Sequence, residues 1–220
     1  PAILIEFLQG HGNPHITPRH LELVGELVAK LHLAVADFCE VRANDLSIAG
    51  LKKIFAGFRG RADEIKSGLE NEIKNEFEFL EKNLPKNLPA GVVHTDIFPD
   101  NVFFIDGYTD QPELSGIIDF YFSCTDFFAY DLAIILNAWC FDTSHKFIPA
   151  RAAALFKGYN SVRQLTDAEK NAMPILVRAA AMRFLCTRAR DWLSPVDGAL
   201  VNMKDPMEYV KKLHYWQEND

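Results

Sequence analysis

Apolar residues recur at helical spacing in two long segments of the first half of the chain. One stripe follows Thr17 and Pro18, a good N-cap and a good first helical residue, and predicts a helix running to about residue 38. A second stripe predicts a helix over 61–83, whose opposite face is rich in Glu and Lys and is expected to be solvated. The two stripes are Leu21, Val24, Val28, Leu31 and Val35, then Ile65, Leu69, Ile73, Phe77 and Leu80.

Shorter apolar runs between turn residues predict strands. Residues 2–8 are expected to form one, which Gly10 to Pro14 breaks. After the prolines and the glycine of 85–91, further short strands are expected at 92–93, 102–105 and 114–118. The Asp106-Gly107 pair between the last two runs predicts a hairpin turn.

The second half of the chain returns to helical patterns. Residues 130–140 are apolar nearly all round, which predicts a buried helix. A capping box at Thr166 to Glu169 predicts another helix, which Pro174 is expected to restart and which continues to about residue 193. Asp205-Pro206 is expected to begin a last one. The pattern therefore predicts a mostly α-helical α+β fold with a small β-hairpin region between helices.

Composition narrows the class of protein. The 220 residues are 49% hydrophobic and carry a net charge of −7, which suits a globular chain and disfavours binding to nucleic acid. No apolar run reaches the ~18 residues of a membrane span, and no polybasic anchor is present. The four cysteines have no C-x-x-C spacing, so a zinc site or redox pair is disfavoured and a reducing, cytoplasmic location is expected.

One stretch carries a specific chemical pattern. His94 to Asn101 contains H-x-D-x-x-x-x-N, and Asp119 follows after the predicted hairpin. A loop carboxylate, an amide five residues later and a second carboxylate beyond a hairpin suit phosphoryl transfer from Mg-ATP to a hydroxyl. Asp96 would orient the attacking hydroxyl and take its proton late, while Asn101 and Asp119 would offer Mg²⁺ the oxygen ligands that it prefers.

Two neighbouring residues are expected to support the loop. His94 is expected to pack and hydrogen-bond rather than carry a proton. Asp131 opens the buried helix and is expected to accept hydrogen bonds from backbone N–H groups of the 94–96 loop, and so to hold Asp96 in place. The alternative interpretation of the whole stretch is a solvated acidic loop.

Residues 93–104 resemble the homoserine kinases of the aminoglycoside phosphotransferase and choline kinase group, which has a protein-kinase-like fold. The likeness extends over nearly the whole chain. Its further segments are 114–122, 129–134, 137–141, 183–185 with Arg188, 191–193 and 204–209. The resemblance implies ATP-dependent, Mg²⁺-assisted phosphorylation of the homoserine side-chain hydroxyl to O-phosphohomoserine, in threonine biosynthesis, with homoserine and ATP as the small-molecule partners.

The resemblance also implies a division of the chain. Residues 1–12 would be the end of a hinge between lobes, where the backbone of Glu6 and Leu8 would hydrogen-bond adenine. Residues 13–220 would form a C-terminal kinase-like lobe, with the catalytic loop at 94–101 and the metal segment at 117–121. The N-terminal β-rich lobe of such kinases has no counterpart here, and the chain contains no G-x-G-x-x-G or P-loop. A truncated chain, inactive alone, is therefore expected.

Substrate contacts are less sharply indicated. A homoserine carboxylate suits an Arg fork, and Arg183 and Arg188 lie in an otherwise apolar helix, although an ion pair with Asp191 or Asp126 explains them equally well. Tyr121 and Asp126 closely follow the metal carboxylate, so that either one could reach the substrate.

Two rival functions remain open at this level. The first is a kinase for another small alcohol, such as choline or an aminoglycoside. The second is a non-catalytic kinase-like binding module, which the presence of Asp96, Asn101 and Asp119 disfavours. The sequence gives no indication of the oligomeric state.

Overall fold

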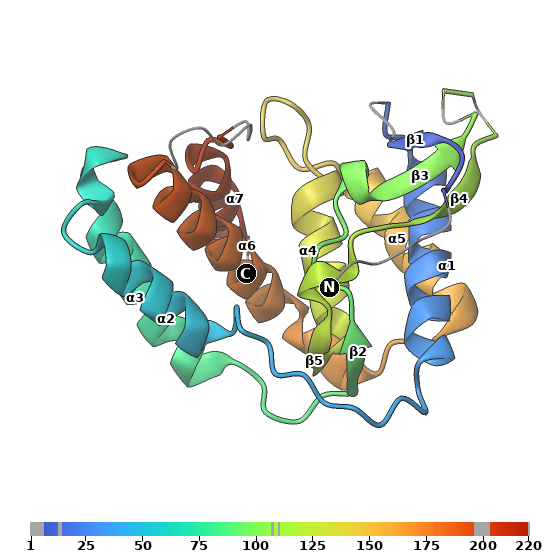
Figure 1. Cartoon of the computed structure of the whole chain (residues 1–220), viewed down its shortest axis with the longest axis horizontal. Coiled ribbons are helices and arrows are strands. Elements are labelled where there is room, and N and C mark those ends of the chain that lie inside the picture. Colours follow the sequence, from blue (N-terminus) through green and yellow to red (C-terminus); the bar gives the residue numbers. More distant parts are fainter. Residues whose placement is uncertain (1–6, 13–14, 107, 110, 196–202, 220) are drawn as a thin grey trace. The chain divides into compact units, whose positions relative to one another are not determined.

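The structure is a computed structural model that describes residues 7–12, 15–106, 108–109, 111–195 and 203–219. Its contacts divide the chain into two compact units (Figure 1). Unit 1 comprises residues 1–42 and 90–165, and unit 2 comprises residues 43–89 and 166–220. Each unit is therefore built from two separate stretches of the sequence.

Unit 1 contains all the described strands. β1 (His11–Gly12), β3 (Val102–Ile105) and β4 (Glu113–Ile117) form an antiparallel sheet in the order β1-β3-β4. β2 (Ala90–Val93) pairs antiparallel with β5 (Cys124–Phe127), so that Val93 lies opposite Cys124. Pairing of β3 with β4 sets Val102 opposite Ile117, which closes the hairpin predicted around residue 106.

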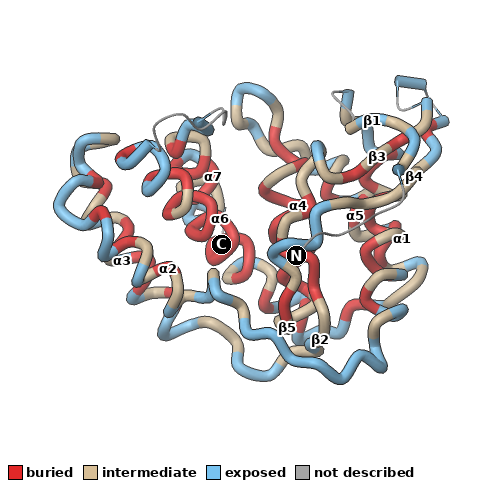
Figure 2. The backbone as a smooth tube through the Cα atoms, in the orientation of Figure 1, coloured by how far each residue is buried: buried red, intermediate tan, exposed pale blue. Residues whose placement is uncertain are grey.

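Three long helices complete unit 1: α1 (Pro18–Ala34), α4 (Phe128–Trp139) and α5 (Pro149–Val162). Helices α1 and α5 approach very closely, because a Cβ atom on Gly25 would lie 2.3 Å from the Leu155 carbonyl oxygen, and one on Gly158 would lie 1.9 Å from that of Glu22. Only glycine permits such an approach. Figure 2 shows α4 as buried along most of its length, as its nearly all-apolar sequence predicts.

Unit 2 is helical in its described part. It contains α2 (Ile48–Phe58), α3 (Leu69–Asn83), α6 (Asp167–Leu193) and α7 (Met207–Glu218). Glu76 of α3 and Arg178 of α6 form a buried bidentate ion pair, with both N–O distances at 2.8 Å. Three short 3-10 helices complete the described elements of the chain: Ala62–Glu64 in unit 2, and Pro99–Asn101 and Phe120–Phe122 in unit 1.

Much of the predicted secondary structure is confirmed. The mostly helical α+β character holds, and α1 begins after Thr17 with Pro18 in its first turn. The capping box at the start of α6 is present, with the Thr166 backbone N–H donating to Glu169 Oε2 at 2.9 Å and the Glu169 N–H donating to Thr166 Oγ1 at 3.2 Å. The buried helix near 130–140 and the final helix are also found.

Several boundaries are corrected. The helix predicted over 61–83 begins only at Leu69, because Gly68 has a φ of +81° and interrupts it. α6 runs through Pro174 as one helix instead of restarting there. Helix α1 ends at Ala34 rather than near residue 38. The strand expected at 2–8 lies mostly outside the described residues, and a strand forms instead at His11–Gly12.

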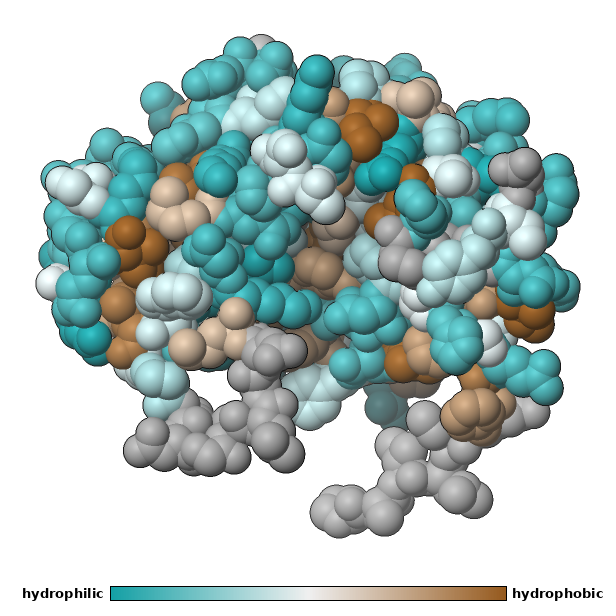
Figure 3. Space-filling view, turned by 90° about the horizontal axis from the view of Figure 1, so that it is seen from above, coloured by the Kyte–Doolittle hydropathy of each residue, from teal (hydrophilic) through white to brown (hydrophobic). Residues whose placement is uncertain are grey.

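The face seen in Figure 3 is mainly hydrophilic, with its hydrophobic residues in small, separate patches. None of the helices in the described part of the chain has both the length and the apolar character that crossing a membrane would require.

Candidate active site

The predicted catalytic loop begins where β2 ends. β2 finishes at Val93 and leads directly into His94, while its partner β5 leads directly into α4. The strand pair therefore holds the start of the loop close to the first turn of α4, which contains Asp131. Two segments more than thirty residues apart in the sequence are joined in this way.

Asp96 and Asn101 are in direct contact. The Asn101 Nδ2 group donates to the Asp96 backbone carbonyl at 2.8 Å and approaches Asp96 Oδ2 at 3.3 Å. The Asp96 carbonyl also accepts from the Phe98 N–H at 2.9 Å, which tightens the turn between them. With its Nδ2 occupied by Asp96, Asn101 keeps Oδ1 as the side-chain atom available to a cation.

Asp119 lies beside this pair. The Ile118 N–H donates to the Asn101 carbonyl at 3.0 Å, which continues the β3–β4 ladder and places Asp119 next to Asn101 along it. Asp119 is exposed and has a left-handed backbone, with a φ of +66°, a conformation that Asp tolerates better than most residues. The structure thus brings Asp96, Asn101 and Asp119 together.

His94 is buried and connects the two halves of the site. Its Nδ1 accepts from the Asp96 N–H at 3.2 Å, and its Nε2 lies 3.0 Å from the Ile118 carbonyl. Because a carbonyl only accepts, Nε2 carries the proton. The ring also lies 4.7 Å from that of Phe120, measured between centroids. Every one of these contacts is structural, as predicted for a packing residue.

Asp131 holds the predicted catalytic loop in place by accepting hydrogen bonds from two of its backbone amides. Its Oδ2 accepts from the His94 N–H at 2.9 Å and its Oδ1 from the Thr95 N–H at 2.7 Å, which is the arrangement the sequence predicts. Burial raises the pKa of Asp131, but the hydrogen bonds from His32 and from the His94 N–H outweigh burial and keep that pKa below its usual range. Asp131 is therefore a fully buried anion.

The backbone of Thr95 is strained, which explains why the loop needs the hydrogen bonds to Asp131. The Thr95 φ of +62° lies in the left-handed region, which is strained for a β-branched residue and costs about 1–3 kcal/mol. The Thr95 hydroxyl donates to the Phe122 carbonyl at 2.9 Å, so that both its backbone and its side chain are held.

Sequence reasoning missed His32, which lies on the buried face of α1. Its Nε2 is 3.0 Å from Asp131 Oδ2, and both side chains are fully buried. The available signal was a histidine four residues after Val28, on the same helical face as the apolar stripe. A buried polar residue at such a position needs a partner, and here the partner is the carboxylate that holds the catalytic loop.

Arg42 was also missed. Its guanidinium donates to the carbonyls of Tyr121 and Ser123 at 2.8 and 3.2 Å. Its backbone carbonyl accepts from the Thr125 N–H at 2.7 Å. Arg42 therefore ties down the segment that follows Asp119, although nothing in the sequence around it signals this role.

Replacing Arg42 with Ala should loosen residues 121–125 and lower kcat by up to roughly thirtyfold, since it removes two hydrogen bonds that are each worth about 1 kcal/mol. Hydrogen exchange of the Thr125 amide should accelerate in the same variant. The matched control is Arg19→Ala, which removes an exposed arginine of α1 whose ion-pair partner, Glu22, lies on the same helix. Equal exchange rates at Thr125 in wild type and Arg42→Ala would contradict the tie.

The two predicted nucleotide contacts are only partly described. Glu6 lies outside the described residues. Leu8 is described, and its side chain packs against β4, because a Cβ atom on Gly116 would lie 2.8 Å from Leu8 Cδ1. The chain just before β1 therefore runs beside the hairpin that follows the catalytic loop.

The predicted substrate residues are spread over both units. Tyr121 is 72% exposed in the segment after Asp119. Asp126 lies in β5, where its Oδ1 accepts from the Phe127 N–H at 2.7 Å. Arg183 and Arg188 are buried on α6 in unit 2. Arg188 has an ion pair, as the alternative interpretation held, but with Glu208 at 2.6 Å, whereas Asp191 pairs with Arg190.

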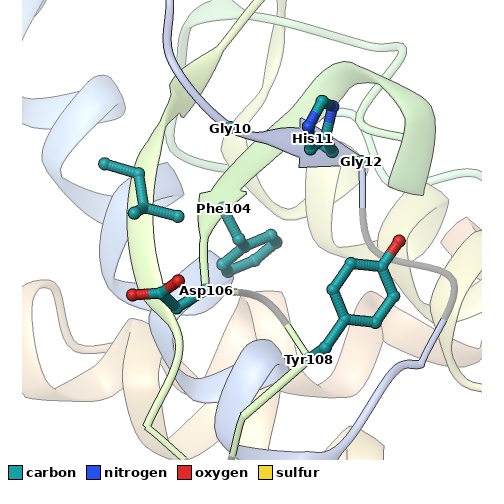
Figure 4. A pocket seen from close by; sticks show the side chains of 7 residues that line it. Gly10, His11, Gly12, Phe104, Asp106 and Tyr108 are labelled. Atoms are coloured by element: carbon teal, nitrogen blue, oxygen red, sulfur yellow. The ribbon is translucent and has the colours of Figure 1, made fainter.

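A cavity of about 300 Å³ lies in unit 1 (Figure 4). It lies between β1 and the turn after β3, with the Phe104 and Tyr108 rings projecting toward it. Its lining residues are Gly10, His11, Gly12, Phe104, Ile105, Asp106 and Tyr108. None of the predicted catalytic or metal residues lines it, although Gly12 lies against the predicted catalytic loop, where a Cβ atom on Gly12 would be 2.8 Å from the Pro99 carbonyl oxygen.

The oxygen donors of Asn101 and Asp119 suit a magnesium ion that is also bound by substrate phosphates. They suit less well a metal ion held by protein ligands alone. Within the described ranges, no group of three or more His, Cys, Asp and Glu side chains is arranged to hold a metal. Asn101 and Asp119 together offer one amide oxygen and one carboxylate. Mg²⁺ is typically held by one or two carboxylates together with substrate phosphates and water, so these residues fit it.

Comparison with known proteins gives consistent results. A family model described as "Phosphotransferase enzyme family" matches residues 1–165. Curated proteins named homoserine kinase match nearly the whole chain. Those of Xanthobacter autotrophicus and Paramagnetospirillum magneticum are 50% and 49% identical over 220 and 218 residues, or 100% and 99% of this chain. The matched part is 67% of each, so the chain spans about two thirds of their length.

Solved structures share the fold at low sequence identity. An ethanolamine kinase from Plasmodium vivax has a TM-score of 0.66 at 15% identity, over 96% of this chain and 63% of that one. A choline/ethanolamine kinase family protein from Mesorhizobium loti has a TM-score of 0.63 at 14% identity, over 97% of this chain and 67% of that one. These similarities concern the fold alone.

Proposed function

The chain belongs to the phosphotransferase enzyme family, in the group of the homoserine kinases, and from this premise we propose that it carries the residues that transfer a phosphoryl group from ATP to the side-chain hydroxyl of homoserine. The product would be O-phosphohomoserine. The observation that carries the proposal is the contact of Asp96 with Asn101, directly beside Asp119, in a chain about half identical to homoserine kinases.

Asp96 acts on the acceptor hydroxyl. Its carboxylate accepts a hydrogen bond from that hydroxyl and points the oxygen at the γ-phosphorus. As the new O–P bond forms and the bond to ADP breaks, the hydroxyl proton passes to Asp96. The contact with Asn101 and the turn through Phe98 fix the carboxylate, so that little reorganisation is needed at the moment of transfer.

Asn101 and Asp119 would hold Mg²⁺, with the Asn101 Oδ1 atom and the Asp119 carboxylate as oxygen donors. The ion, when bound with ATP, supplies neutralisation of the charge on the transferred phosphoryl group. The tie of Arg42 to Tyr121 and Ser123 restricts the segment after Asp119, and thereby the direction of that carboxylate.

The nucleotide requires more than this chain. Residues 1–12 would be the end of a hinge, where the backbone of Glu6 and Leu8 would bind adenine, and residues 13–220 would form a C-terminal lobe. An N-terminal lobe in the full-length protein supplies the remaining phosphate contacts. The 67% coverage of the homoserine kinase relatives supports this division. The chain alone is accordingly expected to bind ATP weakly.

The substrate's charged groups need complementary partners. Asp126 and the exposed Tyr121 are proposed for the ammonium group. Arg183 and Arg188 stay the sequence-based candidates for the carboxylate, and Arg188 also pairs with Glu208. Burial raises the pKa of Glu208, but Lys212 and Arg188 outweigh it and bring that pKa to about 2. Glu208 is therefore charged at neutral pH and occupies the Arg188 guanidinium.

ADP release from Mg-ATP tests the proposal, measured on the full-length protein with homoserine, choline and an aminoglycoside in parallel. Turnover is expected with homoserine alone, and Asp96→Asn serves as the inactive control. Turnover with choline or an aminoglycoside but not with homoserine would retain the phosphotransferase activity and overturn the substrate. Turnover with none of the three, by protein that binds Mg-ATP, would support a binding module instead.

A further inference from the structure

Asp131 belongs to a chain of buried polar groups that extends from the catalytic loop to α5. His32 Nε2 is 3.0 Å from Asp131 Oδ2, and His32 Nδ1 is 2.9 Å from the Tyr159 hydroxyl. Arg163 continues the chain by donating from Nη1 to the same hydroxyl oxygen at 3.0 Å. The close approach of α1 and α5 at Gly25 and Gly158 makes these contacts possible.

One arrangement of protons satisfies every donor and acceptor named in this chain. A guanidinium only donates, so the Tyr159 oxygen accepts from Arg163 and the hydroxyl proton points elsewhere. His32 Nδ1 lies 2.9 Å from the Tyr159 hydroxyl oxygen and accepts that proton. His32 Nε2 then carries the ring proton and donates it to Asp131.

The other forms of His32 fit less well. With the proton on Nδ1, the lone pair of Nε2 would face the Asp131 carboxylate at 3.0 Å. With both nitrogens protonated, the Tyr159 oxygen would face two N–H donors, one from His32 and one from Arg163. Among the described residues, the charged or titratable groups in contact with His32 are Asp131 from α4 and Tyr159 from α5, and Arg163 contacts the same Tyr159 hydroxyl.

Aromatic contacts hold the His32 ring in the plane that its hydrogen bonds to Asp131 and Tyr159 require. His32 stacks on Phe128 with ring centroids 4.7 Å apart and planes 30° apart. The Arg163 guanidinium lies over the same Phe128 ring at 4.8 Å. Neither the His32 ring nor the guanidinium can turn freely without losing these contacts.

We propose that Tyr159 and Arg163 are positioning residues that hold His32 as its Nε2–H tautomer, and that His32 in this form keeps Asp131 oriented toward the amides of His94 and Thr95. The effect on catalysis rests on the proposed function, because it acts through the loop that carries Asp96. The proton arrangement itself does not, because it follows from the contacts of His32 alone.

Tyr159→Phe in the full-length protein is the test, since it removes only the hydroxyl and keeps the ring that packs beside His32. We expect kcat to fall about tenfold, within the range that displacement of a reacting group produces, while KM for ATP and for homoserine changes less than about twofold. Exchange of the His94 and Thr95 amides should accelerate. In ¹⁵N spectra of the imidazole nitrogens, wild-type His32 should show Nε2 protonated and Nδ1 unprotonated, and the variant should lose that pattern.

The control is Tyr209→Phe, which makes the same change at a tyrosine of α7 in unit 2 that is equally buried. A second pair of variants, at His32, separates a positioning role from simple packing. His32→Gln keeps an N–H that can reach Asp131, and His32→Leu does not, so Gln should retain more kcat than Leu at equal folded fraction.

Two results would overturn the proposal. One is wild-type His32 with its proton on Nδ1, or on both nitrogens, at neutral pH. The other is Tyr159→Phe with unchanged kcat and unchanged exchange at Thr95. The spectra and exchange rates need no substrate, so they stand even where the assay with homoserine shows no turnover, and failure of the proposed function is thereby distinguished from failure of this inference.

Discussion

Asp96→Asn should lower kcat by at least two orders of magnitude, with much smaller changes in KM. An amide has nearly the shape of the carboxylate and can stay beside Asn101, but it cannot accept the proton of the attacking hydroxyl. General bases contribute roughly 10²–10⁴-fold to such reactions. Steady-state ADP release by the full-length protein, with homoserine and ATP varied in turn, measures the effect.

Asp100→Asn is the matched control for this variant. Asp100 is exposed, lies in the same loop four residues further on, and undergoes the same chemical change. It should turn over at close to the wild-type rate. A rate for Asp96→Asn within a few-fold of wild type, or an equal loss in both variants, would remove Asp96 from the mechanism.

Asp131→Asn should be the most destabilising single change at the site. Three N–H groups point at this buried carboxylate, from His32, His94 and Thr95, and an amide offers its own N–H to one of them. Removing one partner of a buried charged contact typically costs about 3–5 kcal/mol. The free energy of unfolding from urea titration measures this, and kcat should fall as well because Thr95 loses its restraint.

The pH dependence of the same variant gives an independent check. The pKa of Asp131 is lowered in the folded state, so its contribution to stability is complete above its unfolded pKa, about 3.9, and is lost as the pH falls through the folded value. Wild type should therefore lose stability on acidification below about pH 4 more steeply than Asp131→Asn. Asp37→Asn, at an exposed position after α1, should change neither the stability nor its acid limb.

The sequence was most informative where structure depends on local pattern. The cap at Thr17, the capping box at Thr166 and the hairpin after residue 101 are all encoded within a few neighbouring residues, and each is found. Helix α5 was missed because its sequence is rich in alanine and contains Gly158, so it lacks an apolar stripe. Small residues are what its close contact with α1 requires, and that requirement cannot be seen without α1.

The same distinction holds at the candidate site. Asp96, Asn101 and Asp119 follow a linear pattern that the sequence alone displays, although their roles stay a prediction, and the amide contacts of Asp131 were predicted correctly. His32 and Tyr159 were not, because their roles arise from contacts across 99 and 127 residues of sequence. Strand β5 was missed for a related reason, since its four residues become a strand only by pairing with β2.

The long reach of the chain from Asp131 through His32 to Tyr159 has a consequence for the protein during its synthesis. His94 and Thr95 leave the ribosome well before Asp131, and Tyr159 and Arg163 come later still. At roughly 5–20 residues per second, the loop waits several seconds for its last supports. A nascent chain stalled before α5 would already contain every residue predicted to carry out the chemistry, yet it would lack the contacts that fix their geometry. Competence for phosphoryl transfer is thus acquired late in translation.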